Sequence, residues 1–458
     1  MRALPGARWK VTCAVCAVLC IARDQCWRLA ASTSALSFSC RGAPSGAPRA
    51  PRPQRRRPRG RRPKGRQTSA APNSAAEARR CAPPAPAFIP GLVRPEAIDV
   101  GELNASGDLV LVDKTSDLEA VVRWISGGGS ALVVDHWRDL ERCRAAVLKP
   151  LRRSPANAQE AERCRTLKKT LSDRLLGPVA DGRIDLQGAP RADFLLTLYG
   201  DLFGSGRRFA LPSGVLMGLG NAWQYFEGGV RFSFLAPPVL SQPLRPFYGV
   251  YAYPHPVTHF EMLIEWLQNC SRLGPQRAPQ WALDLGTGCG VVALLLRQIA
   301  RIPHVVATDI SPNAVYGAQE EMKRQDQDIE VVYSDLFEGL GGRRFDVVVF
   351  NPPWLPLPKP SASEPPRTVL DLGNFYSPDL FERFFDNLHH VLNPGGRAVV
   401  LFSNHATSRG YVDKHPFETA LGRGASARSA RSKHLQVEKV PCLAFFLGFL
   451  ICRRNKKV

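Results

Sequence analysis

Residues 282–296 read ALDLGTGCGVVALLL: a short apolar run, a turn with three glycines, and a second apolar run. Gly286, Gly288 and Gly290 permit a sharp turn because glycine has no Cβ, and they let a ligand approach the backbone closely. A buried strand suits the first run, and a helix suits the longer second run. The stretch therefore predicts the first strand, turn and helix of an α/β sheet.

The same alternation continues to residue 402. Strand-like apolar runs lie at 281–285, 304–308, 329–333, 345–350 and 397–402, and helix-like segments lie near 290–300, 312–325 and 379–392. This rhythm predicts a parallel sheet with helices on both faces. Ligands of such sheets bind outside the carboxyl ends of the strands, so the side chains that follow each strand are the candidates for function.

A last apolar run precedes the basic C-terminus. It extends from Pro441 to Cys452, about twelve residues, whereas a helix needs roughly 20 to cross a bilayer. We therefore expect a final strand of the sheet and no stable membrane insertion of the mature chain.

An acidic residue precedes the glycine turn. Asp284 places a fixed negative charge beside the turn, whose spacing is G-x-G-x-G. Val291 stands where the dinucleotide fingerprint G-x-G-x-x-G has its third glycine. The carboxylate would repel a pyrophosphate and attract a cation. S-adenosylmethionine is a ligand of that kind, because it carries an ammonium and a sulfonium group.

Two further acidic residues follow predicted strands. Asp309, in HVVATDIS, lies 19 residues after the last turn glycine, where an acidic side chain can accept hydrogen bonds from both ribose hydroxyls of a nucleotide. Ser311 can cap the helix that follows. Asp335, in VVYSDLFEG, can accept from an adenine amine while Leu336 packs on the base. An isolated Asp after a strand is also commonly a plain turn residue.

The strand at 345–350 ends in a polar and rigid corner, FDVVVFNPPW. Two prolines cannot continue a sheet ladder, since each lacks the backbone N–H and fixes φ near −65°. Asn351 and the backbone carbonyls of the corner can accept hydrogen bonds from one NH2 group, and Trp354 offers a flat surface for stacking. These features predict a site for a planar nitrogen, where positioning and electrostatics do most of the catalysis.

These four elements resemble motifs I to IV of the class I S-adenosylmethionine-dependent methyltransferases that modify amide or exocyclic nitrogens. LDLGTGCG, ATDISPNAV and SDLFE are especially similar to the HemK family of release-factor glutamine methyltransferases and to enzymes with a methyltransferase small domain. The resemblance covers about 246–405 and implies a Rossmann-like sheet of seven strands. It also implies that S-adenosylmethionine is the cofactor.

The resemblance assigns roles to individual residues. Asp284, Gly286 and Gly288 would contact the methionine part, Asp309 the ribose and Asp335 the adenine. Asn351 with Pro352 would hold the acceptor nitrogen. The candidate cofactor-binding residues are Asp284, Gly286, Thr287, Gly288, Gly290, Asp309, Ile310, Asp335, Leu336 and Asn351, and the candidate catalytic residues are Asn351, Pro352, Pro353 and Trp354.

The chain departs from the HemK pattern in three places. Trp354 stands where the family usually has Tyr. An acidic element like PRPETE is replaced by AYPHPVTHFEML (252–263), in which only Glu261 is acidic. The Pro-rich loop 355–379 lacks the family's glycine pattern, and we expect it to act as a lid or a substrate contact.

Three functions are compatible with these motifs. The first is N-methylation of a glutamine side chain in a protein, such as a translation release factor of an organelle. The second is N-methylation of a base in RNA or DNA, and the third is a non-catalytic binding module on the same fold. Intact Asp284, Asp309 and Asn351 favour an enzyme, and a glutamine acceptor ranks slightly ahead of a base.

The positive charge of the chain is concentrated at its N-terminus. Residues 1–80 hold 18 Lys and Arg against two acidic residues, so the rest carries only +5 of the total +21. A twelve-residue apolar run (11–22) is followed by a basic, acid-poor stretch that includes 51–66. This leader resembles a bipartite plastid-targeting sequence, with a mitochondrial presequence as the second interpretation. As a plain disordered tail it would touch RNA nonspecifically and leave the protein in the cytoplasm.

Residues 81–245 form a separate N-terminal block of α/β or α+β type, followed by the methyltransferase-like part at 246–458. In the block, 108–113 and 130–137 are predicted strands. Segments 139–153 and 157–176 are predicted helices with Asp139 and Asn157 as N-caps. The seven cysteines beyond the leader show neither CxxC pairs nor zinc-like spacing with histidines, so reduced thiols and no metal are expected.

Overall fold

The chain divides into two compact units, Met1–Ala85 and Pro86–Val458. The structure is a computed structural model and describes residues 88–153, 158–204, 208–232, 240, 242–250, 258–270, 278–357, 369–422, 435–441 and 447–454. All of them belong to the second unit. The predicted leader therefore lies outside the described residues, and the boundary at 245/246 stays a prediction.

The first sheet of this unit is mixed. Its strands are β1 (Ile98–Asp99), β2 (Leu109–Val112), β3 (Ser130–Val133), β4 (Leu175–Ala180), β5 (Arg183–Ile184) and β6 (Phe209–Pro212). The order is β1-β6-β4-β3-β2, with β5 paired to β4. Strands β2, β3 and β4 are parallel, whereas β6 is antiparallel to both β4 and β1. The expectation of an N-terminal α/β or α+β block is confirmed.

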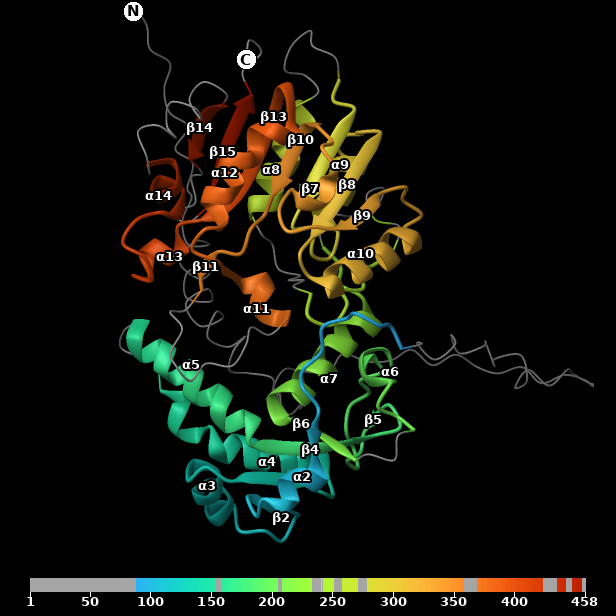
Figure 1. Ribbon diagram of the computed structural model, residues 1–458, viewed down its shortest axis with the longest axis vertical. Helices are drawn as coiled ribbons and strands as arrows, with labels where there is room; N and C mark the ends of the chain where they lie inside the picture. Colours follow the sequence, from blue (N-terminus) through green and yellow to red (C-terminus); the bar gives the residue numbers. More distant parts are fainter. Residues whose placement is uncertain are drawn as a thin grey trace, which may run out of the picture. The chain divides into compact units, whose positions relative to one another are not determined.

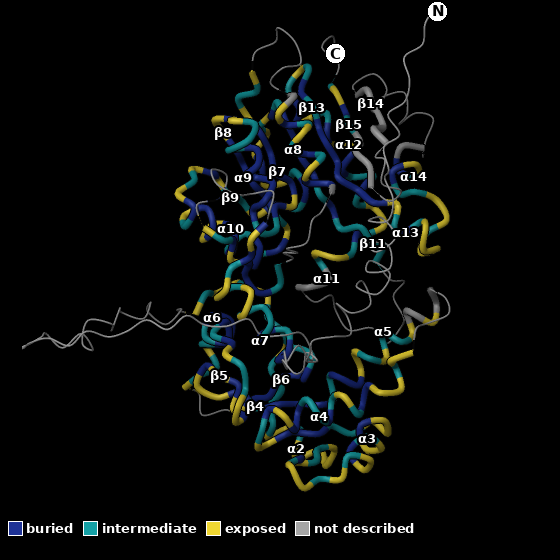
Figure 2. The backbone as a smooth tube through the Cα atoms, turned by 180° about the vertical axis from the view of Figure 1, so that it is seen from behind, coloured by how far each residue is buried: buried dark blue, intermediate teal, exposed yellow. Residues whose placement is uncertain are grey.

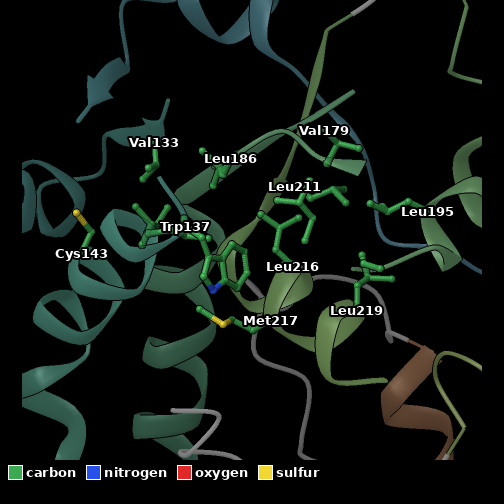
Figure 3. Packing of buried hydrophobic residues seen from close by; sticks show 14 of the residues in the cluster. Val133, Trp137, Cys143, Val179, Leu186, Leu195, Leu211, Leu216, Met217 and Leu219 are labelled. Atoms are coloured by element: carbon green, nitrogen blue, oxygen red, sulfur yellow. The ribbon is translucent and has the colours of Figure 1, made fainter. Parts of the chain in front are cut away.

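Helices cover this first sheet. They are α2 (Val100–Ala105), α3 (Leu118–Ser126), α4 (Trp137–Val147), the 3-10 helix η1 (Lys149–Arg152), α5 (Ala158–Asp173), α6 (Phe194–Tyr199) and α7 (Ser213–Gly228). Most of their apolar side chains and those of the strands form one cluster, and Figure 3 shows Trp137 of α4 among the side chains of this cluster. Val100 and Leu103 of α2 instead pack in a second, smaller cluster with side chains of the strands. Burial of such side chains is the main stabilising contribution to this part of the fold.

Several details of the elements predicted here are wrong. The strand predicted to reach residue 137 ends at Val133, and the helix predicted to reach residue 153 ends at Val147, before η1. Helix α4 begins at Trp137, and its N-cap is His136, not Asp139. Trp137, the first residue of α4, is 7% exposed and packs in the apolar cluster of the first sheet. The helix predicted to reach residue 176 ends at Asp173, because Leu175 and Leu176 instead pair with β3. Asn157 lies outside the described residues.

The second sheet has seven strands in the order β14-β15-β13-β10-β7-β8-β9, which can be followed across Figure 1. The strands are β7 (Trp281–Leu285), β8 (His304–Asp309), β9 (Glu330–Tyr333), β10 (Phe345–Phe350), β13 (Leu392–Ser403), β14 (Leu435–Pro441) and β15 (Leu447–Arg454). Strands β9, β8, β7, β10 and β13 are parallel, and β15 is antiparallel to its neighbours β13 and β14. The predicted Rossmann-like class I sheet of seven strands is confirmed. The order reverses between β7 and β10, which is where such sheets bind ligands.

Both faces of the second sheet are covered, as predicted. Helices α8 (Thr258–Cys270) and α9 (Val291–Gln298) contribute to the cluster on one face, and α12 (Leu380–Val391) and α14 (Pro416–Gly422) to the cluster on the other. Strand side chains alternate between them, so that Val347 and Val349 belong to the first cluster and Val348 and Phe350 to the second. The central strands are accordingly dark blue in Figure 2.

Smaller elements complete the second sheet's surroundings. They are α10 (Pro312–Arg324), the 3-10 helix η3 (Glu338–Leu340), α11 (Val369–Asn374), α13 (His405–Ser408) and the two-stranded pair β11 (Leu355–Pro356) and β12 (Phe375–Tyr376). The final apolar run contributes β15, so its interpretation as a strand is confirmed. None of the helices in the described ranges has the length and apolar character needed to cross a membrane.

Candidate active site

The glycine turn after β7 is left-handed at three positions. Gly286, Gly288 and Gly290 have φ values of 69°, 55° and 86°. The Thr287 N–H donates to the Thr308 carbonyl at 2.8 Å, which ties the turn to the end of β8. Because a Cβ makes this conformation costly, the three glycines are required by the backbone itself.

The three glycines differ in what surrounds them. A Cβ on Gly286 would lie 3.4 Å from the Phe350 ring, and a Cβ on Gly290 would lie 2.5 Å from the Met322 methyl carbon. A Cβ on Gly288 would have no heavy atom within 4 Å. Gly288 is thus the position where the turn presents its backbone to open space, and a ligand can approach there.

Asp284 is buried beneath the turn, with 1% of its surface exposed. One carboxylate oxygen accepts from the Thr287 hydroxyl at 2.6 Å and from the Ala293 N–H at 2.9 Å. Burial raises the pKa of Asp284 to about 7, and the nearby Asp309 charge adds to the increase. Asp284 is therefore a buried carboxyl group whose negative charge a bound cation would stabilise.

Asp309 lies at the end of β8 and reaches back to the turn. Its carboxylate accepts from the Gly288 N–H and the Ser311 N–H, both at 2.9 Å. Burial raises the pKa of this group as well. Ser311 caps α10 by accepting from the Ala314 N–H, so the predicted cap is confirmed. Ile310, between them, is 40% exposed and offers an apolar surface beside the acid.

Asp335 and Leu336 follow β9. The Asp335 carboxylate pairs with Arg383 of α12 at 2.8 Å, and Arg383 also contacts Glu338 at 3.1 Å. Leu336 is buried and has φ 48°, a strained value for a residue with a Cβ. Strain of this kind often marks a functional loop. An adenine that used Asp335 would share it with Arg383.

The corner after β10 holds two polar atoms without partners. Within the described residues, Asn351 Oδ1 and Trp354 Nε1 are buried and make no hydrogen bond. Pro352 is buried between them, and Pro353 is partly buried. Buried polar groups are almost always paired, so an unpaired acceptor and an unpaired donor at a strand end point to a ligand that supplies the missing partners.

The sheet brings the four predicted elements to one edge. In the register of the strands, Leu285 pairs with both Thr308 and Phe350, so the turn lies between Asp309 and the Asn351 corner. Asp309 pairs with Tyr333, two residues before Asp335. The candidate residues therefore line consecutive strand ends in the order β9, β8, β7 and β10.

Sequence reasoning missed His259 of α8. It is 5% exposed, its ring contacts Trp354 with centroids 5.0 Å apart, and its Nδ1 is buried without a hydrogen-bond partner among the described residues. The same stretch offered Glu261 as its only acid, and that residue is exposed. A histidine directly before an apolar run is a weak signal that becomes informative only beside Trp354.

A family model described as methyltransferase small domain matches residues 249–357, which contain the glycine turn, Asp309, Asp335 and the Asn351 corner. This part of the chain is a class I methyltransferase domain. The match ends at residue 357.

Several proteins similar to this part of the chain carry the same name. The chain is 36% identical over 135 residues to a release factor glutamine methyltransferase of Geobacter sulfurreducens, covering 27% of this chain and 46% of the relative. Proteins of the same name match from Koribacter versatilis (33% over 188 residues, 39% and 61% covered) and Salmonella typhimurium (32% over 164 residues, 33% and 57% covered). The chain thus spans about half to three fifths of the length of these relatives.

Proposed function

We propose that the protein is an S-adenosylmethionine-dependent N-methyltransferase that modifies a glutamine side chain of a translation release factor. The observation that carries the proposal is the carbonyl oxygen of Asn351 at the end of β10, which is buried and has no hydrogen-bond partner among the described residues. It lies in a methyltransferase small domain whose relatives are named for that reaction.

The residues at the strand ends fit the cofactor. Gly288 presents its backbone to open space, and the buried Asp284 carboxylate would be stabilised by a cation such as the ammonium group of the methionine part. Asp309 would bind the ribose hydroxyls, and the exposed side chain of Ile310 would lie against the base. When bound, S-adenosylmethionine supplies a methyl group made electrophilic by its sulfonium.

Asn351 would orient the acceptor. Its Oδ1 would accept a hydrogen bond from the amide NH2, and the Pro352 carbonyl would accept a second. Holding both hydrogens directs the nitrogen lone pair out of the amide plane and toward the methyl group. The amide nitrogen is a weak nucleophile, so this positioning is the main contribution of the chain to the rate.

The cell compartment is part of the proposal. The basic, acid-poor segment that follows the apolar run 11–22 supports an organelle, with a plastid ahead of a mitochondrion. Fusing residues 1–80 to a fluorescent reporter tests this, and a diffuse cytosolic signal would return the leader to an untargeted tail.

The enzyme is tested by transfer of radiolabelled methyl groups into a total organelle extract, followed by separate protease and ribonuclease treatment. We expect the label to be lost with protease and retained with ribonuclease. Label lost with ribonuclease would assign the reaction to an RNA base.

The matched variants are Asn351→Ala and Asn387→Ala. Asn351→Ala is expected to abolish transfer while changing the cofactor Kd, measured by calorimetry, by less than about threefold, because only the acceptor contact is removed. Asn387 is exposed on α12 and donates to a backbone carbonyl of its own helix, so Asn387→Ala should transfer normally. A large loss of cofactor affinity in Asn351→Ala would refute the acceptor role.

A further inference from the structure

The indole N–H of Trp354 is buried and has no hydrogen-bond partner within the described residues. An indole nitrogen can only donate, and a buried donor without a partner costs about 1–3 kcal/mol. A chain that only needed a flat apolar surface could use Phe at this position without that cost. The unpaired N–H therefore calls for a ligand with an acceptor.

Asn351 Oδ1, three residues earlier, is an unpaired polar atom of the opposite kind. It is a buried acceptor to which no group in the described part of the chain donates. Pro352 and Pro353 lie between these two residues, and each proline ring fixes its own φ near −65°. Donor and acceptor are thus carried by one stiff corner at the end of β10, and little conformational entropy is lost when both bind the same small group.

We propose that Trp354 is a specificity-determining residue whose N–H donates to the carbonyl oxygen of the acceptor carboxamide, while Asn351 accepts from its NH2. A primary carboxamide presents this acceptor and donor side by side. The inference rests on the proposed function and adds a second contact to it.

The packing of Trp354 favours hydrogen bonding over stacking as its main role. The indole packs against the cluster of Phe350 and Tyr376 on one face of the sheet, and its ring also contacts His259 at 72°. These two contacts reduce the ring surface on which a nucleobase could stack. A carboxamide needs little ring surface, because both of its polar atoms are met by the corner itself.

His259 acts as the positioning residue for the indole. Its ring lies 5.0 Å from the Trp354 ring and is nearly perpendicular to it, the edge-to-face arrangement that aromatic pairs prefer. Burial lowers the pKa of His259 to about 4, so the imidazole is neutral at physiological pH. A neutral ring fixes the indole without placing a positive charge near a cationic cofactor.

The full chain is tested with Trp354→Phe and with a matched control, Trp281→Phe. Trp281 also lies against a histidine, His304, with centroids 4.5 Å apart, but at the opposite end of β7. Trp354→Phe keeps the ring and removes the N–H. We expect it to lower kcat/KM for the protein acceptor about 10- to 100-fold with the cofactor Kd unchanged, and we expect Trp281→Phe to behave as wild type.

Two further variants separate hydrogen bonding from packing. Trp354→Tyr retains a donor and should recover part of the kcat/KM that Trp354→Phe loses. His259→Phe keeps an aromatic edge and should raise KM less than His259→Ala, while neither changes the cofactor Kd. Thermal unfolding of each variant identifies any that fails to fold. The kcat/KM of Trp354→Phe is then compared with that of Trp354→Tyr, which also changes the ring but retains a donor.

The outcomes distinguish this inference from the proposed function. Wild-type transfer together with a Trp354→Phe variant as active as Trp281→Phe would overturn the hydrogen bond and leave the methyltransferase intact. Label on RNA, or no binding of S-adenosylmethionine by wild type, would overturn the proposed function and this inference with it.

Discussion

In the part of the chain that the structure describes, the two large sheets both contain parallel strands that end in acidic residues, and the environments of Asp113 and Asp284 are opposite. Asp113, directly after β2, accepts from the Thr115 N–H and hydroxyl at 2.8 and 2.7 Å and from Ser116 at 3.0 Å. These hydrogen bonds, led by the Thr115 hydroxyl, lower the pKa of Asp113. Asp284, at the end of β7, has a raised pKa because it is buried.

The unpaired polar atoms show the same contrast. In the first sheet's surroundings, the buried side-chain atoms without partners among the described residues lie on helices α4 and α7. In the second sheet's, some lie on helices α8, α10 and α13, but Thr308, Asn351 and Trp354 each carry one at or just beyond a strand end. A sheet whose strand ends are internally satisfied is a scaffold, whereas one that leaves them unsatisfied is prepared for ligands.

The largest expected effect is on cofactor binding by Gly288→Ala. The new Cβ would meet no protein atom but would occupy the space that the turn presents to the ligand. Gly341→Ala is the matched control, because Gly341 has φ 59°, equally open space, and a place at the end of η3 away from the turn.

Both variants should lose about 1–2 kcal/mol of stability, the cost of a Cβ in the left-handed region. Only Gly288→Ala should weaken cofactor binding, by about 100-fold or more, as measured by calorimetry. Equal affinities in the two variants would show that the turn does not face the cofactor.

The sequence predicts correctly those features that depend on residues adjacent in the chain. The glycine spacing of residues 286–290 and the β-branched run 345–350 predict the second sheet, because adjacent residues determine the backbone conformation of the turn and the burial of the strand. Ser311 was found as a cap for the same reason. The unpaired state of Trp354 could not be predicted, since it depends on which groups the fold places around the indole.

The first sheet shows the limit of that reasoning. The sequence predicts its strands at 108–113 and 130–137, although β3 ends at Val133 and Trp137 begins α4. It does not predict β6, because Phe209–Pro212 is too short to show a period. Leu175 and Leu176 were assigned to a helix and belong to β4, a case in which pairing with a distant strand overrides local helix propensity. His259 was missed because its partner lies 95 residues away.

The second prediction concerns the pH dependence of Asp284. Its pKa is raised from 3.8 to about 7 on folding, so the folded state binds more protons between those values. The stabilisation is therefore full below about pH 3.8 and is lost as pH rises from there through about 7, by an amount on the order of a few kcal/mol. Asp284→Asn should remove this part of the pH dependence.

Urea unfolding of wild type and Asp284→Asn from pH 4.5 to 8 measures this pH dependence of the free energy of unfolding. The difference between the free energies of unfolding of the two proteins cancels the contribution of His259. The pKa of His259 is lowered to about 4, so its contribution to stability changes with pH in the opposite direction. Cofactor affinity should rise with pH in wild type and less in the variant, because ionised Asp284 attracts the cation. A constant difference in stability across this range would contradict the raised pKa.

A smaller effect is expected in the first sheet. Asp113→Ala removes the acceptor of three hydrogen bonds from Thr115 and Ser116 and should lower Tm modestly, whereas Asp113→Asn keeps an acceptor and should lower it less. Neither variant should change the cofactor Kd or methyl transfer, because this strand end is satisfied within its own turn. A loss of transfer in Asp113→Ala with retained stability would give the first sheet a direct role in the reaction.

The smallest effect is expected for Thr308→Val. The Thr308 hydroxyl is buried without a partner among the described residues, so replacing it by a methyl of similar shape should leave stability unchanged or raise it by up to about 1 kcal/mol. Thr287→Val is the contrasting variant, because the Thr287 hydroxyl donates to Asp284 at 2.6 Å, and its loss should cost about 1–3 kcal/mol. Thermal and urea unfolding compare the two. If Thr308→Val weakens cofactor binding while stability is unchanged, the unpaired hydroxyl is itself a ligand contact, and the contrast between the two sheets extends to β8.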